Sequence, residues 1–225
     1  MKRFVPVIAL VIAAVVLGAV NATAFAYRWI QGTVKVAGPT DARGAACVGF
    51  YSSADQSGIS PTYLPEAGTN YNAPTYSNNK TSVTPGQPVC QWSVGTKTYS
   101  LYEGITVTIP ITVGSWYIKD FYGFGYNGTS SDPTVYVYIK VEQSITDENI
   151  VAANLTLYNA TSGAKVAKVA TVNLKKTGLA TTTPIELRPG NGLQLDLFIN
   201  ATGATTTSAT FKVGFYVSQE QEAPR

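Results

Sequence analysis

The chain has 225 residues, of which 13% are charged and 45% hydrophobic, and its formal net charge is +3 at pH 7. It contains no histidine and two cysteines, which excludes Ser-His-Asp and Cys-His catalysis and leaves too few ligands for a zinc or iron–sulfur cage. No basic stripe is present for phosphate contacts, so we expect no nucleic-acid partner. Because histidine is absent and only two cysteines are present, we also expect no cofactor, no metal site and no enzymatic activity.

The first 26 residues form an expected export signal. A short basic region, Lys2-Arg3, precedes an unbroken apolar run over residues 4–20, and small residues then alternate up to Ala26. This order predicts a signal helix that is cleaved after Ala26, with Ala24 as the second choice. A retained membrane anchor is the alternative, since the apolar segment is long enough to span a bilayer with tilt.

Residues 27–37 form a candidate strand at the start of the mature chain. It is either the first strand of its own sheet or a donor strand that enters a groove of a neighbouring subunit. Donor burial contributes on the order of 8–12 kcal/mol before ordering costs, and such a head-to-tail contact generates a filament. The candidate donor residues are Tyr27, Trp29, Ile30, Gly32, Val34 and Val36, of which Ile30, Gly32, Val34 and Val36 share one face.

Cys47 and Cys90 flank a long stretch, residues 52–87, that is rich in Ser, Pro, Tyr, Asn and Gly. Export favours a disulfide between them, worth about 3–4 kcal/mol on the chain-entropy model. The alternative is a pair of free, buried thiols. A structureless loop of this length is rare in a compact domain, so a short strand or turn inside it is compatible with the pattern.

The dominant sequence period beyond the signal is two. Apolar residues alternate strictly over residues 105–113, 135–141, 193–199 and 211–217. Weaker candidate strands cover residues 27–37, 46–53, 88–93, 98–102, 115–121, 151–158, 165–175 and 184–188. This spacing predicts an all-β fold, an antiparallel β-sandwich of jelly-roll type, over residues 38–225. Pro110 cannot donate to a ladder, so its strand is expected at an edge or without a partner there.

One sequence motif and the acidic residues bear on possible chemistry. Gly123-Phe-Gly125-Tyr-Asn-Gly128 matches the dinucleotide-binding pattern, but a strand follows it where that mechanism needs a helix, so we assign it no phosphate. The acidic residues are scattered, and only two carboxylates brought together in a cleft would favour a hydrolase. The aromatic residues between Trp116 and Tyr126 favour core and loop packing over a sugar-stacking or subunit-contact surface.

Five glycosylation sequons lie beyond the signal. A glycan needs a solvated asparagine, and these positions fall in loops, at strand ends or on an outward face. Asn154 is expected to point outward because Val151, Ala153, Leu155 and Leu157 are assigned to the inward face. We expect at least two sites to be occupied in a host that glycosylates exported proteins. The sequon asparagines are Asn79, Asn127, Asn154, Asn159 and Asn200.

The junction after the signal resembles a known family. An apolar signal that ends Thr-Ala-Phe-Ala26, an aromatic residue and a Gly32-x-Val34-x-Val36 strand are similar to the TasA/camelysin family of biofilm fibre subunits. Archaeal bundling pili and threads are similar in outline. The resemblance implies a secreted jelly-roll subunit of an extracellular fibre, with residues 27–37 as the donor segment. Heavy glycosylation is a feature of the threads.

Together these observations predict a structural protein: the subunit of an extracellular filament on the cell surface, built from copies of itself, with a role in biofilm or cell–cell adhesion. Uncharged outward Thr side chains also permit lateral bundling, and membrane contact is expected only during export. The alternatives are a monomeric secreted carbohydrate-binding or envelope-associated domain, a secreted hydrolase that uses paired carboxylates, and a membrane-anchored surface protein. A monomer with residues 27–37 in its own sheet would favour the secreted binding domain.

Overall fold

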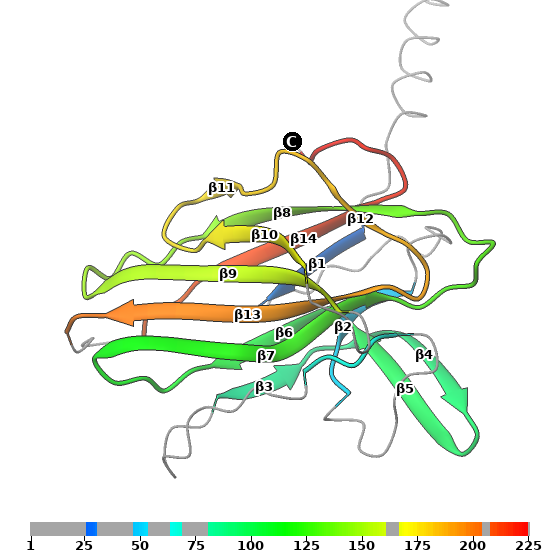
Figure 1. The fold of residues 1–225 in the computed structure, drawn as a ribbon, viewed down its shortest axis with the longest axis horizontal. Helices are drawn as coiled ribbons and strands as arrows, with labels where there is room; N and C mark the ends of the chain where they lie inside the picture. The colour runs from blue at the N-terminus through cyan, green and yellow to red at the C-terminus, as the bar shows by residue number, and fades with distance from the viewer. Residues whose placement is uncertain are drawn as a thin grey trace, which may run out of the picture.

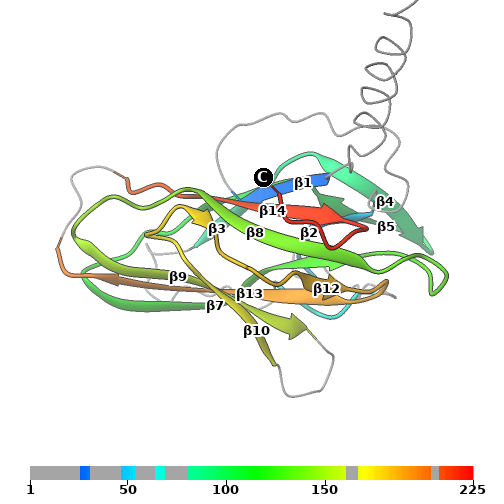
Figure 2. The same ribbon diagram turned by 90° about the horizontal axis from the view of Figure 1, so that it is seen from above.

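The computed structural model describes residues 26–30, 47–53, 64–68, 81–160, 167–203 and 208–224. In these residues the protein is all-β, which confirms the expected class, and two seven-stranded sheets lie in two layers (Figures 1 and 2). The residues predicted to form the signal helix lie outside the described part, apart from Ala26. No helix in the described part is long and apolar enough to cross a membrane.

The first sheet, called here the β1 sheet, has the order β11-β8-β14-β1-β6-β3, with β12 also paired to β8. All of its described pairs are antiparallel except β1 with β6, which is parallel. Its strands are β1 (Ala26–Ile30), β3 (Ser82–Pro85), β6 (Gly104–Thr108), β8 (Val135–Gln143), β11 (Gly178–Leu179), β12 (Ile185–Leu187) and β14 (Lys212–Ser218).

The second sheet, called here the β13 sheet, has the order β10-β9-β13-β7-β2-β5-β4 and is antiparallel throughout its described pairs. The β4–β5 hairpin extends from the body of this sheet (Figure 1). Its strands are β2 (Val48–Tyr51), β4 (Pro88–Val94), β5 (Lys97–Tyr102), β7 (Gly114–Tyr126), β9 (Ile150–Ala160), β10 (Lys168–Asn173) and β13 (Gly192–Ala201).

One apolar core joins the two sheets. The inward residues of β14 and β8 in the β1 sheet belong to the same buried cluster as those of β13, β9 and β7. Phe215 of β14 contacts Phe124 of β7 with ring centroids 4.8 Å apart and Phe50 of β2 at 5.1 Å. Alternation with one buried face is the pattern that the sequence period indicates.

Three sequence expectations differ from the observed strands. The expected strand 105–113 ends at Thr108, whereas the short strand that the sequence allowed inside the 52–87 stretch is present as β3. The expected strand 115–121 extends to Tyr126 as β7. Val151 was assigned to the inward face, which is wrong: it is 50% exposed, because strict alternation toward the core in β9 starts only at Ala153.

A disulfide joins Cys47 and Cys90, with a Cα–Cα distance of 5.1 Å. It links the start of β2 to β4 and packs against a second, smaller apolar cluster that contains Tyr51, Leu64 and Leu101. The bond therefore fixes the β4–β5 hairpin to the end of the β13 sheet.

Candidate assembly site

The first described strand, β1, lies in the middle of a sheet of its own chain. It pairs antiparallel with β14, from Ala26 opposite Val217 to Ile30 opposite Val213. On its other side it pairs in parallel with β6, where Ile30 is opposite Ile105. This placement is the one expected for a first strand of its own sheet, and it defines the gap between β14 and β6, called here the slot.

Within the described residues, β1 is the only strand that connects the two sides of the slot. β14 pairs with β8 and β1, whereas β6 pairs with β1 and β3. Removing β1 would therefore leave β6 and β3 without a ladder to the rest of their sheet and would expose two strand edges. Unpaired edges are ready templates for another chain.

The walls of the slot are apolar on the core side. Val213, Phe215 and Val217 of β14 and Ile105 of β6 are no more than 1% exposed. These side chains belong to the core that joins both sheets. The walls of the slot are therefore part of the core between the sheets.

The predicted donor residues divide into two groups. Tyr27, Trp29 and Ile30 lie in β1. Gly32, Val34 and Val36 lie outside the described residues. β1 begins at Ala26, the residue that the sequence analysis assigned to the end of the signal.

The sequon asparagines differ in accessibility. Asn159 is exposed, and Asn154 and Asn200 are half-buried, with Asn154 on the opposite face from buried Ala153 and Leu155. The Asn127 side chain donates from Nδ2 to Cys47 Sγ at 3.6 Å, so the atom that would carry a glycan is engaged. Asn79 lies outside the described residues. Asn159 is thus the most accessible of the described sites.

A buried polar cluster that the sequence analysis did not find lies on β7 and β13. One oxygen of Asp196 accepts hydrogen bonds from the backbone N–H of Asp120 and from Gln194 Nε2, both at 2.8 Å, and the other accepts from the Tyr117 hydroxyl. Asp120 has a φ of 49° and accepts a bond from the Gly68 N–H at 2.8 Å. Burial, followed by the bond to Asp196, raises the pKa of Tyr117.

Two acidic residues meet in this cluster, but the Asp196 carboxylate is bonded to the Asp120 backbone N–H and the Asp120 carboxylate to the Gly68 N–H. These hydrogen bonds hold the irregular backbone of β7, since the register between β13 and β7 shifts between Leu195 and Leu197. Both side chains are at most 7% exposed. We interpret the cluster as the support of a β-bulge. The sequence has no periodic pattern that would predict it.

The aromatic stretch is mainly core. Phe121, Tyr122, Phe124 and Tyr126 are at most 2% exposed, as expected from the packing interpretation. Tyr117 is 54% exposed and remains the residue available to a sugar or a second subunit.

The two leading glycines of the Gly123–Gly128 motif serve packing. A Cβ at Gly125 would lie 2.8 Å from the Tyr51 ring and 2.9 Å from Leu64, and one at Gly123 would lie 2.8 Å from Tyr51. The Tyr51 hydroxyl donates to Pro65 O at 2.7 Å. The glycines thus make room for a tyrosine that crosses β7.

Comparison with known proteins identifies no relative: no family model and no curated protein matches the chain. Within the described residues, no group of three or more His, Cys, Asp or Glu side chains is placed to hold a metal ion. The slot is therefore the feature on which a functional proposal can be built.

Proposed function

We propose that this protein is the structural subunit of an extracellular filament that assembles head to tail by N-terminal donor-strand complementation. In this proposal the two sheets form a jelly-roll β-sandwich, and the strand that fills each slot comes from the next copy. The filament acts in biofilm formation or cell–cell adhesion, as the resemblance to biofilm fibre subunits implies. The exported subunit carries its disulfide and glycans into the polymer.

The observation that carries the proposal is that β1 alone connects β14 with β6 in the described chain. Cleavage of the expected signal would place this strand at the start of the mature protein. A strand at the chain start leaves its sheet without threading the rest of the fold. Residues 31–47 separate β1 from β2, and fully extended they reach about 60 Å. The same contacts therefore form within one chain or between two, which is the condition for a strand swap.

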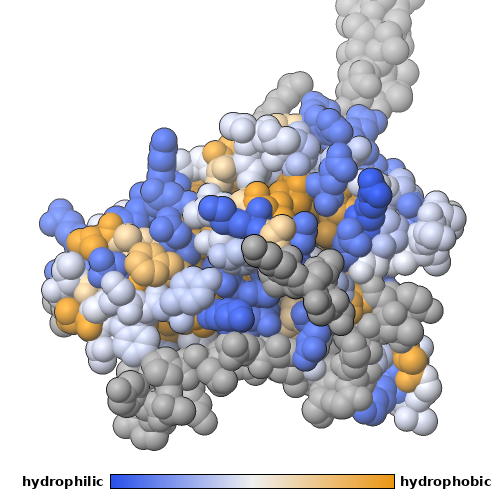
Figure 3. Space-filling view, viewed as in Figure 1, coloured by the Kyte–Doolittle hydropathy of each residue, from blue (hydrophilic) through white to orange (hydrophobic). Residues whose placement is uncertain are grey.

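The surface chemistry also supports assembly of identical copies. In the view of Figure 3, hydrophobic colours appear at the end where β9 begins and β13 ends and also in the upper middle of the molecule. The exposed apolar residues there include Val113, 58% exposed, and Val151, 50% exposed. Apolar exposure of this kind favours contacts between filaments and fits the proposed lateral bundling.

The test uses the secreted full-length protein. We expect mass spectrometry to find a mature N-terminus near residue 27 and electron microscopy to find filaments. An excess of a synthetic peptide of residues 27–37 fills the slot in trans and shortens the filaments, whereas the same peptide with Ile30→Asp does not. A protein that stays monomeric at every concentration contradicts the proposal.

The second candidate is a monomeric secreted binding domain. Its support is specific: β1 is paired within its own chain, so the single copy has no open slot. Size-exclusion chromatography with light scattering separates the candidates, because the binding domain stays at one chain's mass while the filament subunit shifts to larger species as concentration rises.

A further inference from the structure

Three aromatic side chains share the outward face of the β13 sheet. The leucines of β13 belong to the core, so alternation turns Phe198 to the outward side. Phe198 is opposite Tyr117 of β7 on one side and Asn154 of β9 on the other. Tyr158 of β9 is opposite Gln194, which lies on the same face of β13. The rings of Tyr117, Tyr158 and Phe198 thus come from three adjacent strands (Figure 1) and form what we call here the aromatic face.

The Tyr117 ring lies along the sheet instead of standing upright from it. Tyr117 is opposite Phe198, but its hydroxyl donates to Asp196, two residues away along β13. Burial, the bond to Asp196 and a side-chain bond to Tyr158 raise the pKa of Tyr117, in that order. Tyr117 is still 54% exposed, whereas Asp196 is 2% exposed. A buried carboxylate therefore holds an exposed ring in place before any ligand binds, which lowers the ordering cost of binding.

The aromatic face is nearly neutral. β7, β9 and β13 contain three charged residues, Lys119, Asp120 and Asp196. Both aspartates are buried and accept hydrogen bonds from backbone N–H groups. Lys119 is exposed, so it is the charge of these strands that a ligand would meet. One exposed lysine contributes little attraction for an anion and repels a cation, so the face fits an uncharged ligand.

The neighbours of the rings carry amides and hydroxyls. Asn154, Thr156 and Asn200 lie on the outward face and are half-buried. Their side chains both donate and accept hydrogen bonds, as the hydroxyls of a sugar do. A pyranose ring also presents C–H groups with partial positive charge, which complement the negative π face of an aromatic ring. The bond to the Asp196 carboxylate adds electron density to the Tyr117 ring and strengthens this complementarity.

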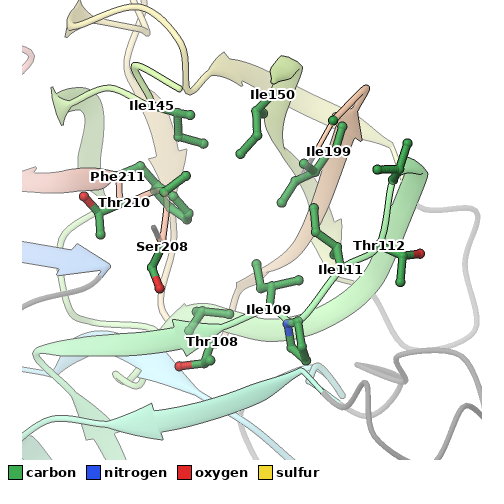
Figure 4. A pocket seen from close by; sticks show the side chains of 16 residues that line it. Thr108, Ile109, Ile111, Thr112, Ile145, Ile150, Ile199, Ser208, Thr210 and Phe211 are labelled. Atoms are coloured by element: carbon green, nitrogen blue, oxygen red, sulfur yellow. The ribbon is translucent and has the colours of Figure 1, made fainter. Parts of the chain in front are cut away.

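An apolar hollow on the inner side of β13 differs from the aromatic face. It has a volume of about 570 Å³, and isoleucine side chains from several segments converge on it (Figure 4). Isoleucines offer neither a flat ring nor hydrogen bonds, so the hollow is poorly matched to a sugar. Ile199 lines the hollow, whereas the adjacent Phe198 belongs to the aromatic face. The principal lining side chains of the hollow are Ile109, Ile111, Ile145, Ile150, Ile199 and Phe211.

We infer that the aromatic face is a binding platform for a neutral saccharide, whose pyranose rings stack on Tyr117 and Phe198 while the adjacent amides and hydroxyls bond to the sugar hydroxyls. Two sources supply this chemistry: an extracellular polysaccharide, and an N-glycan on Asn154, which is opposite Phe198. All parts of the platform belong to one chain, so it is available to a filament subunit and to a monomer alike.

The test measures binding of cellohexaose, laminarihexaose and chitohexaose to the full-length protein, made in a host without N-glycosylation, by isothermal titration calorimetry. We expect at least one of them to bind, and Phe198→Ala and Tyr117→Ala to weaken its binding at least ten-fold. Tyr117→Phe keeps the ring and loses the bond to Asp196, so it should weaken binding less than Tyr117→Ala. Two controls should bind like the parent: Tyr136→Ala, which removes a half-buried ring of β8 in the other sheet, and Ile111→Ala in the hollow.

Protein from a glycosylating host distinguishes the two sources. Binding by both preparations assigns the platform to a free polysaccharide, whereas binding by the unglycosylated protein alone assigns it to the chain's own glycan.

Three results would overturn the platform. The first is that the unglycosylated protein binds none of the probes, which includes the case in which Phe198→Ala abolishes only self-association and the face is a contact between subunits. The second is an equal loss of binding from Phe198→Ala and Tyr136→Ala. The third is a steep loss of affinity with added salt, because Lys119 and not the rings would then provide the contact.

Discussion

The central strands of the two sheets are held in different ways. In the β13 sheet, β7, β9 and β13 have 13, 11 and 10 residues and pair along most of their length. In the β1 sheet, the described part of β1 covers 5 residues, and within it Trp29 and Ile30 pair with Gly104 and Ile105 of β6. The β13 sheet consists of long strands from the body of the fold, whereas the β1 sheet depends on β1 to connect β14 with β6.

This difference separates stability from assembly. Changes in the β13 sheet should lower the free energy of unfolding and affect filaments only through folding. Changes in β1 or the slot should affect filaments first. Four predictions test the stability side of this comparison, ordered from the largest expected effect to the smallest, and a last measurement tests the assembly side.

The disulfide should contribute the most to the β13 sheet. The disulfide closes a loop between two residues that are 43 positions apart in the sequence. Replacing Cys47 and Cys90 together by Ala should therefore lower the free energy of unfolding by about 4 kcal/mol on the chain-entropy model. Urea unfolding of the oxidised parent and the double variant measures the loss. Equal unfolding midpoints would show that the hairpin end is held without the covalent bond.

The Leu195→Ala substitution comes next. Leu195 is fully buried in β13 between β9 and β7, so its truncation leaves a cavity and should cost about 3 kcal/mol. Val151→Ala on the neighbouring strand is the control, because Val151 is half exposed and should change unfolding by less than about 0.5 kcal/mol. Similar losses from both variants would show that the burial of Leu195 does not give it the larger contribution expected here.

Gly125→Ala should have a smaller effect. The added Cβ would sit 2.8 Å from the Tyr51 ring, and overpacking of this kind costs about 1–3 kcal/mol. Gly95→Ala is the comparison, since its Cβ would meet nothing and only its φ of 63° is unfavourable, worth about 1 kcal/mol. Thermal unfolding of both variants measures the difference. Equal losses would show that the contact of the added Cβ with Tyr51 has no cost beyond that of the backbone change.

Alkaline pH should weaken the fold gradually. Burial is the main cause that raises the pKa values of Tyr51 and Tyr216. The negative charge of Asp120 adds to this effect at Tyr51, and the hydrogen bond to Glu142 adds to it at Tyr216. Tyrosines in the unfolded chain titrate near pH 10. Because the native pKa values are higher, these tyrosines contribute their full stabilisation of the native state below pH 10, and the contribution is lost as the pH rises above it.

Unfolding midpoints measured between pH 8 and pH 12, with absorbance at the tyrosinate band, check this sign. Tyr51→Phe should flatten the fall above pH 10 because it removes one of the titrating groups. A stability that rises above pH 10 would contradict the burial of these phenols in the native state.

Local patterns predicted most of the strands because period two is a local property. The runs around Val137, Leu195 and Phe215 are strands with the expected inward faces. The run from Ile105 to Val113 was overestimated, since β6 stops at Thr108 and Ile109 and Ile111 line the hollow instead. Alternation alone does not distinguish a strand from an extended segment that covers a cavity.

The sequence could not predict which segments pair when they are far apart in the chain. Nothing near Ile30 indicates that it pairs with Val213 and Ile105, and nothing near Asp196 indicates that it supports a bulge at Asp120. Both depend on segments that meet only after folding. The candidate donor strand was found from its terminal position and its alternation, whereas the slot required the sheet order.

The most direct measurement of donor-strand assembly uses the pair Tyr27 and Tyr216, which are opposite each other in the β1–β14 ladder. Full-length chains with Tyr27→Cys are mixed with chains that carry Tyr216→Cys, and the mixture is concentrated, oxidised and run on a non-reducing gel. The account predicts a disulfide between two chains that increases with filament formation. If a single chain that carries both Tyr27→Cys and Tyr216→Cys forms the bond internally while the mixture gives no product, the account is contradicted.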